Sequence, residues 1–426
     1  MIAKLMSDKL FGNCVPTFSL AERDRRWNLA RGFMRRHGVD ALLVYGEHED
    51  AGASQFNFDT WFTNDRPGTT VLMPRHGEPI AFLPMPLYVL DRMEGARRGD
   101  DCWVSAKSIR IGRNSDELAE TLITQGLRAA TIGVVGLDPY IPWHPQGVIP
   151  YRFWHNIITA FPDIEFRPVG GEFGQLIMPL SGEELAVLRH AALLGDVIVD
   201  AMVAAARPGV SEAAVYAAGT AAANSRATVV PGMHLWSGAE FAASGPPQWG
   251  FRPTTPRSLR DGDFLAAEVF SCFGQRHTQH QVAIAIGDVH PDIERAAAIA
   301  RTCYEAGLAT LTTNASFGEV AEAMLAPVEA AGQWVRGPQI HSLNPFGAMA
   351  RYSSGYQLEG IEDYPAVTSS PTRYADMELE PGMSFAFEPS CGFGRHIVTV
   401  GGTVVVGEAD PIELSPHTAH LLRAPT

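Results

Sequence analysis

The stretch EVFSCFGQRHTQHQVAIAIG, residues 268–287, constrains the fold more than any other part of the chain. It reads as a hairpin that ends in the buried strand VAIAIG, because apolar runs lie on both sides of a Gly-containing turn. Polar side chains crowd the hairpin just before that strand: Glu268, Gln275, Arg276, His277, Gln279, His280 and Gln281. These groups either face solvent on one side of a sheet or line a pocket in which a ligand is bound and changed.

Length and composition bound the class of protein. A chain of 426 residues with 46% hydrophobic and 19% charged residues predicts a soluble protein with two domains. The formal net charge of −14 argues against a nucleic-acid partner. No stretch approaches the roughly 20 apolar residues of a membrane span, and the N-terminus lacks the apolar core of a signal peptide. The chain has five cysteines without CxxC spacing: Cys14, Cys102, Cys272, Cys303 and Cys391. This spacing argues against a disulfide framework or structural zinc, so we expect a cytoplasmic protein.

Strands alternate with helices in the first part of the chain. Residues 20–38 have helical spacing of apolar groups and stop at a glycine, and residues 39–46 then form a buried strand. Residues 69–84 predict a hairpin that turns at His76-Gly77, and residues 129–136 another apolar strand. This alternation predicts a mixed α/β layer.

The pattern changes near residue 178. Ser181, with Glu184 three residues later, forms a capping box that opens a long Ala-rich helix, and Ser211 caps a second helix. We place the domain boundary near residue 175, which gives domains 1–175 and 176–426. Further strands are predicted at FLAAEVF, VAIAIG, MSFAFEP and TVVVG, and helices at 291–312 and 316–331.

Three of these later segments carry groups suited to acid–base chemistry. Glu268, His341 and Glu388 each lie in or beside an apolar strand. A carboxylate in such a place is costly to bury unless it has partners, and an imidazole can take and return a proton near neutral pH. We therefore predict that these side chains converge in one cavity.

The segment PGMSFAFEP, residues 381–389, resembles the signature of the creatinase, aminopeptidase P, prolidase and methionine aminopeptidase superfamily. Other segments match this superfamily in order: LSGEELAVLRHAALLGDVIV, RPGVSE, ASGPP, RDGDFLAAE, GPQIHS and GTVVVGEADPIELS. The likeness spans residues 178–417, and RRWNLARGFMRRHGVDALLVYG extends it to the first half. The resemblance implies an α+β protein: a C-terminal pita-bread domain, preceded by a smaller α/β creatinase-like N-terminal domain. It also implies a hydrolase, with lyase chemistry as an alternative.

Metal-dependent members of the superfamily hold two divalent ions with two Asp, one His and two Glu. The positions that match this set by resemblance are Glu268, Thr278 or Gln279, His341, Glu388 and Gly401. Two of the five are neutral or absent, and two adjacent ions need several negative ligands to offset their charge. We therefore expect no dinuclear site and no metal cofactor.

The leading hypothesis is a creatinase-like, metal-independent enzyme that acts on a small polar or carboxylate-bearing molecule, by C–N bond hydrolysis or lyase chemistry with His/Glu acid–base catalysis. The position that matches creatinase's catalytic histidine lies near Phe251, so the base would be His277, His280 or His341. His277 and His280 differ by three and point to opposite faces of a strand. The creatinase spacing favours His280, whereas direct counting places His277 with the two neighbouring glutamines.

Further residues are candidates for binding the substrate. His234 and Trp249 flank the ASGPP segment, and Arg395 and His396 precede the closing strand, where they would bind an acidic group. Residues 56–67 match a loop with which creatinase-like dimers complete a partner's pocket, so a homodimer is implied, with Trp61 as a further candidate. The substrate-binding candidates are Gln279, Gln281, Trp249, His234, Arg395, His396 and Arg66.

Two other functions remain open. A mononuclear metal-dependent hydrolase or lyase, similar to Xaa-Pro peptidases, would hold one Zn, Fe or Mn ion through a mixed carboxylate and imidazole set: Glu268, His277, His280, His341 and Glu388. A catalytically inactive binding protein of the same fold would instead show a large exposed apolar patch and no base near a carboxylate.

Overall fold

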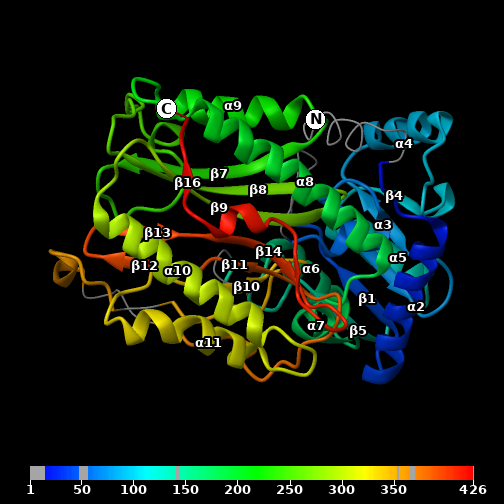
Figure 1. Cartoon of the computed structure of the whole chain (residues 1–426). Helices are drawn as coiled ribbons and strands as arrows, with labels where there is room; N and C mark the ends of the chain where they lie inside the picture. Colours follow the sequence, from blue (N-terminus) through cyan, green and yellow to red (C-terminus); the bar gives the residue numbers. More distant parts are fainter. Residues whose placement is uncertain (1–14, 48–55, 141–143, 353–354, 365–369, 426) are drawn as a thin grey trace. The chain divides into compact units, whose positions relative to one another are not determined.

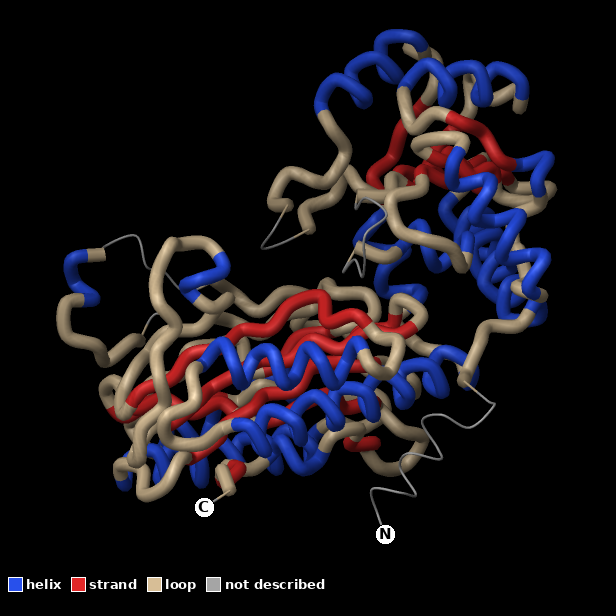
Figure 2. Tube along the Cα trace, turned by 90° about the horizontal axis from the view of Figure 1, so that it is seen from above, coloured by secondary structure: helices blue, strands red, loops and turns tan. Residues whose placement is uncertain are grey.

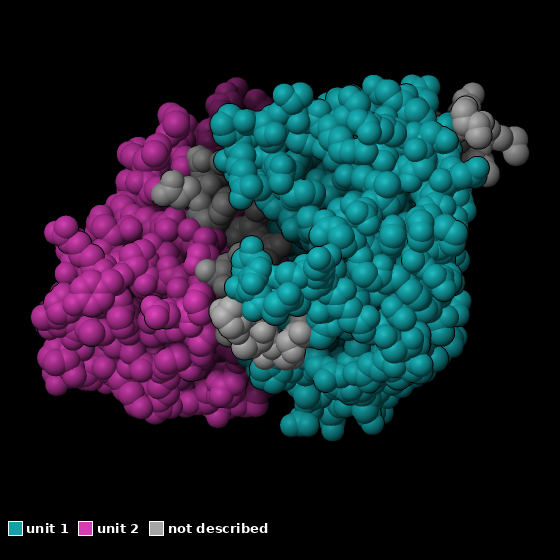
Figure 3. Space-filling model, turned by 90° about the vertical axis from the view of Figure 1, so that its left-hand side faces the viewer, with its two compact units in different colours: residues 1–16, 178–426 teal, residues 17–177 magenta. Residues whose placement is uncertain are grey.

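The computed structural model describes residues 15–47, 56–140, 144–352, 355–364 and 370–425, so Cys14 lies outside the described residues. The chain divides into two compact units (Figure 3). One comprises residues 17–177, and the other comprises residues 178–426 together with 1–16.

The first unit is built on a six-stranded mixed sheet with the order β4-β3-β2-β1-β5-β6. Its strands are β1 (Ala41–Val44), β2 (Thr70–Pro74), β3 (Ile80–Leu83), β4 (Ile109–Ile111), β5 (Thr131–Val135) and β6 (Glu165–Pro168). Its helices are α2 (Leu20–His37), α3 (Phe58–Thr63), α4 (Leu87–Arg98), α5 (Ser115–Thr124), α6 (Tyr151–Ala160) and α7 (Gly170–Ile177). The central strand β1 pairs antiparallel with β2 and parallel with β5, as an α/β layer requires.

Local signals fix the first elements of this unit. The Ser19 side chain accepts a hydrogen bond from the Glu22 backbone N–H and caps α2, and Gly38 ends the helix in the left-handed conformation at φ 64°. The predicted turn at His76-Gly77 joins the antiparallel strands β2 and β3, with Gly77 at φ 85°. These predicted elements are confirmed within a few residues.

A buried carboxyl group in α3 makes the stability of this unit depend on pH. Burial raises the pKa of Asp59 to about 7, although backbone N–H groups, including those of Gly68 and Thr69, donate to it. The folded state favours the protonated form, so stability is fully present below the ordinary pKa and is lost as pH rises through about 7.

Asp59→Asn keeps an acceptor for these N–H groups without the charge. We expect the melting temperature of the variant to lie a few degrees above that of the wild type at about pH 8. At about pH 4, where wild-type Asp59 is also neutral, we expect a much smaller difference. Calorimetry at the two pH values checks this. An equal margin at both would contradict the assignment.

The second unit carries a sheet with the order β10-β11-β14-β9-β8-β7; β15 pairs with β14, and β16 with β9. Its strands are β7 (Val229–Gly238), β8 (Phe264–Phe273), β9 (Arg276–Ala285), β10 (Ile340–Ser342), β11 (Ser384–Phe387), β14 (Gly401–Val405), β15 (Ile412–Glu413) and β16 (Leu422–Arg423). A separate hairpin is formed by β12 (Ser390–Phe393) and β13 (His396–Thr399). Strand β7, which we did not predict, occupies one end of the sheet order.

Two helix pairs cover this sheet. The helices α8 (Gly182–Ala205) and α9 (Glu212–Asn224) lie along β7, β8 and β9, whereas α10 (Pro291–Thr310) and α11 (Phe317–Ala330) form the other pair (Figure 1). The predicted capping box of Ser181 and Glu184 opens α8, and an equivalent box of Ser316 and Glu319 opens α11. In the secondary-structure view the blue helices run along the red strands of this unit (Figure 2). The described part of the chain has no helix long and apolar enough to cross a bilayer.

The β8–β9 hairpin sets the register on which the site depends. Gly274 and Gln275 turn with φ of 52° and 57°, the left-handed conformation that tight two-residue hairpins use. This turn places Glu268 directly opposite Gln281. Side chains at alternate positions then point to the same face of the sheet.

Candidate active site

Six predicted residues come together on one face of the second unit's sheet. They arrive on β7, β8, β9 and β10 and just after β11, so segments more than 150 positions apart in the sequence meet there. The cluster, which we call the carboxylate cluster, comprises His234, Glu268, Gln279, Gln281, His341 and Glu388.

Glu268 forms one end of the carboxylate cluster. His234 Nδ1 lies 2.9 Å from its Oε2, and the Gln279 amide donates to its Oε1. Burial pushes the pKa of Glu268 upward, but the contact with His234 and electrostatic interactions with His341 and Arg336 outweigh it, so the pKa lies below the ordinary value. Glu268 is therefore an ionised carboxylate near neutral pH.

Glu388 forms the other end, and its protonation state differs. The Gln281 amide donates to its Oε2 at 3.0 Å. Burial raises the pKa of Glu388 well above the ordinary value, and the neighbouring charge and hydrogen bond of Glu268 add to this, with Arg336 opposing it in part. Two carboxyl groups in contact cannot both ionise cheaply, and here the environment keeps the proton on Glu388.

His341 connects to Glu388 in a defined tautomer. Its Nδ1 lies 2.9 Å from the Ser342 carbonyl oxygen, which can only accept, so the proton resides on Nδ1 and the Nε2 lone pair is available. That Nε2 lies 3.5 Å from Glu388 Oε1. Burial lowers the pKa of His341, with the Ser342 carbonyl and Glu268 opposing, so the ring is neutral near pH 7. A neutral imidazole beside a protonated carboxyl group is an acid–base pair.

Arg336 and Tyr352 belong to this environment, and the sequence did not reveal them. Arg336 Nη2 donates to Thr399 Oγ1 at 2.9 Å. Burial lowers the pKa of the guanidinium, while Glu268 and Glu388 raise it. Burial and the same two glutamates raise the pKa of Tyr352 to about 12. The one available sequence signal was the position of Arg336, directly before the GPQIHS segment.

His280 does not join the carboxylate cluster. It is fully buried on the opposite face of β9, where Nε2 contacts Asp196 Oδ1 at 3.2 Å and Ser415 Oγ at 2.7 Å. Gly195 of α8 makes room for the ring, since a Cβ there would lie 2.0 Å from His280 Cε1. The spacing argument that favoured His280 was therefore wrong about the face, because this ring anchors β9 to α8.

His277 shares the cluster's face by strand alternation, as direct counting predicted. Its Nε2 lies 3.8 Å from Cys272 Sγ, and its backbone N–H donates to Asn344 Oδ1. Burial raises the pKa of Cys272 to about 12, so the thiol stays protonated and is not a nucleophile.

The remaining candidates lie elsewhere. Trp249 packs with Tyr216 in the core beneath α8 and α9, Arg395 is exposed in the β12–β13 turn, and His396 stacks on His290. In the first unit, Arg66 pairs with Asp91, and Trp61 is buried against Phe173.

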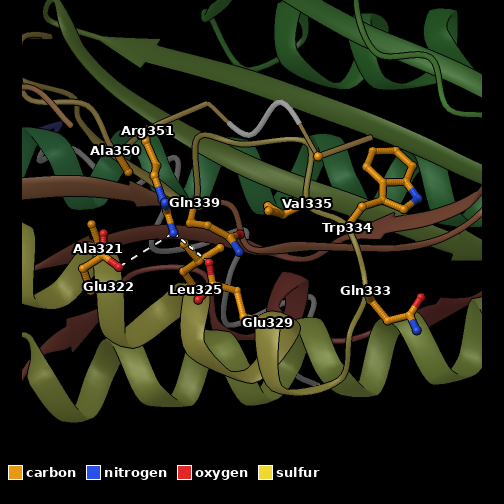
Figure 4. Close-up of a pocket in the computed structure, with 11 residues that line it drawn as sticks. Ala321, Glu322, Leu325, Glu329, Gln333, Trp334, Val335, Gln339, Ala350 and Arg351 are labelled. Atoms are coloured by element: carbon orange, nitrogen blue, oxygen red, sulfur yellow. Dashed lines mark hydrogen bonds and ion pairs between the residues drawn. The ribbon is translucent and has the colours of Figure 1, made fainter. Parts of the chain in front are cut away.

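A pocket of about 360 Å³ lies between α11, the segment 333–339 and residues Ala350, Arg351 and Gly355 (Figure 4). Arg351 reaches between Glu329, at 2.7 Å, and Glu322, at 3.8 Å, on its α11 side. Gln339 also lines it, and the Gln339 carbonyl accepts from the Glu388 backbone N–H. None of the six members of the carboxylate cluster lines this pocket.

The fold defines the class: a two-domain protein with an α/β N-terminal unit and a pita-bread C-terminal unit. The model of metallopeptidase family M24 matches residues 186–408, slightly more than half of the chain. The chain belongs to metallopeptidase family M24. The predicted superfamily, fold class and hydrolase activity are thereby confirmed.

Solved structures of peptidases share the fold. The chain is similar to the dipeptidase PepE from Mycobacterium ulcerans, with 18% identity, a TM-score of 0.69, and coverage of 96% of this chain and 100% of that one. It is also similar to an X-Pro aminopeptidase from Thermotoga maritima, with 14% identity, a TM-score of 0.70, and coverage of 93% of this chain and 99% of that one. An Xaa-Pro dipeptidase from Bacillus anthracis is similar too, with 16% identity, a TM-score of 0.69, and coverage of 94% of this chain and 99% of that one. No curated protein sequence is close enough to match.

Members of the family typically hold a pair of divalent ions, and the residues present in this chain do not fit such a pair. Gly401 stands where the last glutamate is expected, and a Cβ there would lie 2.2 Å from the Phe387 carbonyl oxygen. Amide groups of Gln279 and Gln281 occupy oxygens of Glu268 and Glu388 that ions would need. Within the described ranges, the one group of three or more potential ligands with all ligand atoms within 4.8 Å lies elsewhere, at His290, Asp292 and His396.

Proposed function

We propose that the protein is a metal-independent hydrolase that cleaves a C–N bond in a small, carboxylate-bearing molecule. The observation that carries this proposal is the split between the two carboxyl groups: Glu268 ionised, Glu388 protonated, and neutral His341 3.5 Å from the latter. Such a pair supplies a base and an acid at the same pH.

His341 and Glu388 can carry out all the proton transfers of the reaction and return to their starting states. His341 Nε2 takes a proton from water, and the resulting hydroxide adds to the substrate carbon. The C–N bond breaks as Glu388 gives its proton to the leaving nitrogen. The protonated His341 then returns its proton to the Glu388 carboxylate, which restores the starting state. The 3.5 Å separation of Nε2 and Oε1 supports this last transfer, because a small movement brings them into hydrogen-bond range.

The other members bind and orient the substrate. Glu268, held by His234 and Gln279, offers a negative charge to a cationic part of the molecule. Arg336 lies in the electrostatic range of both glutamates and offers a positive charge to a carboxylate. One fixed charge of each sign suits a small zwitterion. A homodimer stays a prediction.

A second candidate is a metal-dependent Xaa-Pro peptidase-like enzyme with one divalent ion, which the family membership favours. Glu268, Glu388 and His341 would be its ligands, after displacement of the two glutamine amides.

Turnover in the presence of a chelator separates these functions. Small zwitterions, guanidines, amides and Xaa-Pro dipeptides are incubated with protein stripped of metal, and products are detected by mass spectrometry. We expect cleavage to persist without metal. Activity that appears only after Zn²⁺, Fe²⁺ or Mn²⁺ is added would establish the second candidate. Ligands that raise the melting temperature and are never cleaved, with or without metal, would indicate an inactive binding protein.

A further inference from the structure

A second group of ligating side chains lies outside the carboxylate cluster, where the β12–β13 hairpin meets α10. His290 is the N-cap of α10, Asp292 lies in the first turn of that helix, and His396 begins β13. One ligand atom from each lies within 4.8 Å of the others. The group, which we call the hairpin triad, thus joins two elements that are separate in sequence.

The hairpin triad converges on one carboxylate oxygen. Asp292 Oδ2 lies 3.5 Å from His290 Nδ1 and 3.9 Å from His396 Nδ1. The two imidazole rings stack with centroids 4.2 Å apart and planes within 6°. A tetrahedral ion with bonds of about 2.0–2.1 Å holds its ligand atoms about 3.3 Å apart, which is close to the present separations. Because the two rings are parallel, their in-plane lone pairs do not yet converge, so binding of an ion requires both rings to rotate out of the stack. The His290 side chain is half exposed.

Neighbouring groups prepare these atoms for ligation. Arg295 donates to Asp292 Oδ1, which fixes the carboxylate and leaves Oδ2 toward the imidazoles, as partners of metal ligands commonly do. The Asp292 backbone N–H donates to His290 Nδ1 at 3.2 Å, so this nitrogen is the unprotonated one, and an ion bound to it would replace this hydrogen bond.

We propose that His290, Asp292 and His396 bind one divalent transition-metal ion, with Zn²⁺ the best suited, and that water fills its remaining positions. Two imidazoles with one carboxylate suit Zn²⁺, Co²⁺, Ni²⁺ or Fe²⁺ and disfavour Mg²⁺ and Ca²⁺, which prefer oxygen ligands. The ion would be structural. It would tie the N-terminus of α10 to the hairpin that follows Glu388 directly in the sequence.

Metal titration of the full-length protein tests the proposal without any assay of activity. The protein is stripped with a chelator and titrated with Zn²⁺ by calorimetry, and with Co²⁺ by visible absorption. We expect one Zn²⁺ to bind to this group in the wild type. In His396→Gln and in His290→Asn we expect the Zn²⁺ affinity to be lower by about tenfold or more. Asparagine keeps an acceptor for the Asp292 N–H, so the cap of α10 survives.

His341→Gln is the matched control, since it removes an imidazole from the carboxylate cluster. Its Zn²⁺ binding at the hairpin triad is expected to equal that of the wild type. The proposal is overturned if the wild type binds no Zn²⁺, or if His396→Gln and His290→Asn bind as many ions with the same affinity. Circular dichroism of each variant separates loss of the site from loss of the fold. A confirmed site would also mean that a stoichiometric ion in the purified protein is no evidence for metal-dependent catalysis.

Discussion

Glu388→Gln is expected to lower kcat/KM by about 10²–10⁴-fold while leaving the fold intact. Glutamine matches the shape of the protonated side chain and can still accept from the Gln281 amide. It has no proton to give to a leaving nitrogen. Steady-state kinetics on any substrate found by the screen, with Glu305→Gln on the exposed face of α10 as the control, checks this.

The pH dependence of the same variant gives an independent test. Because the pKa of Glu388 is raised, the active form is the protonated one, and wild-type activity should fall as pH rises through that pKa. The stability that comes from burying the neutral carboxyl group is lost over the same rise, so Glu388→Gln should gain stability relative to the wild type at higher pH. An alkaline decline of activity that persists unchanged in Glu388→Gln would exclude Glu388 as the acid.

Arg276→Met is expected to destabilise the second unit by about 3–5 kcal/mol, the largest stability effect among these variants. Arg276 Nη2 lies 2.6 Å from Glu184 Oε1, and both side chains are almost fully buried. Removing the arginine leaves the Glu184 carboxylate buried without this partner. Urea denaturation, followed by fluorescence and circular dichroism, measures the loss.

A double variant identifies the cause. Glu184→Gln in the Arg276→Met background removes the buried charge, and the glutamine can still accept from the Ser181 N–H in the capping box. We expect most of the lost free energy of unfolding to return. If the double variant is as unstable as Arg276→Met alone, packing of the arginine stem, and not the charge, is responsible.

Elements with local causes were predictable from the sequence. Ser181 and Glu184 carry the α8 capping box within four residues, and Gly38 ends α2 through its own backbone freedom. Strand β7 was missed because Pro231-Gly232 is a typical turn signal, and its pairing with β8 shifts register between Val229 and Gly232. Its formation depends on the long strand beside it, which is a tertiary effect.

In the candidate site, too, some residues were predictable from local sequence, whereas others depend on the tertiary fold. Glu268 stands out because it lies within an apolar strand, and Glu388 because it follows one directly. Strand periodicity separates the faces of His277 and His280. Which face meets the cluster depends on α8, where Gly195 leaves space for one ring. Arg336 and Tyr352 act through charges brought together by the tertiary fold, and nothing in the nearby sequence encodes that proximity.

The backbone at Gly401 limits how this protein could change in evolution. Its φ of 128° and the carbonyl oxygen of Phe387 leave no space for any larger residue. Introducing an acidic side chain there would require the adjoining strand to shift as well, so a single substitution at this position cannot supply the last ligand of a two-ion centre.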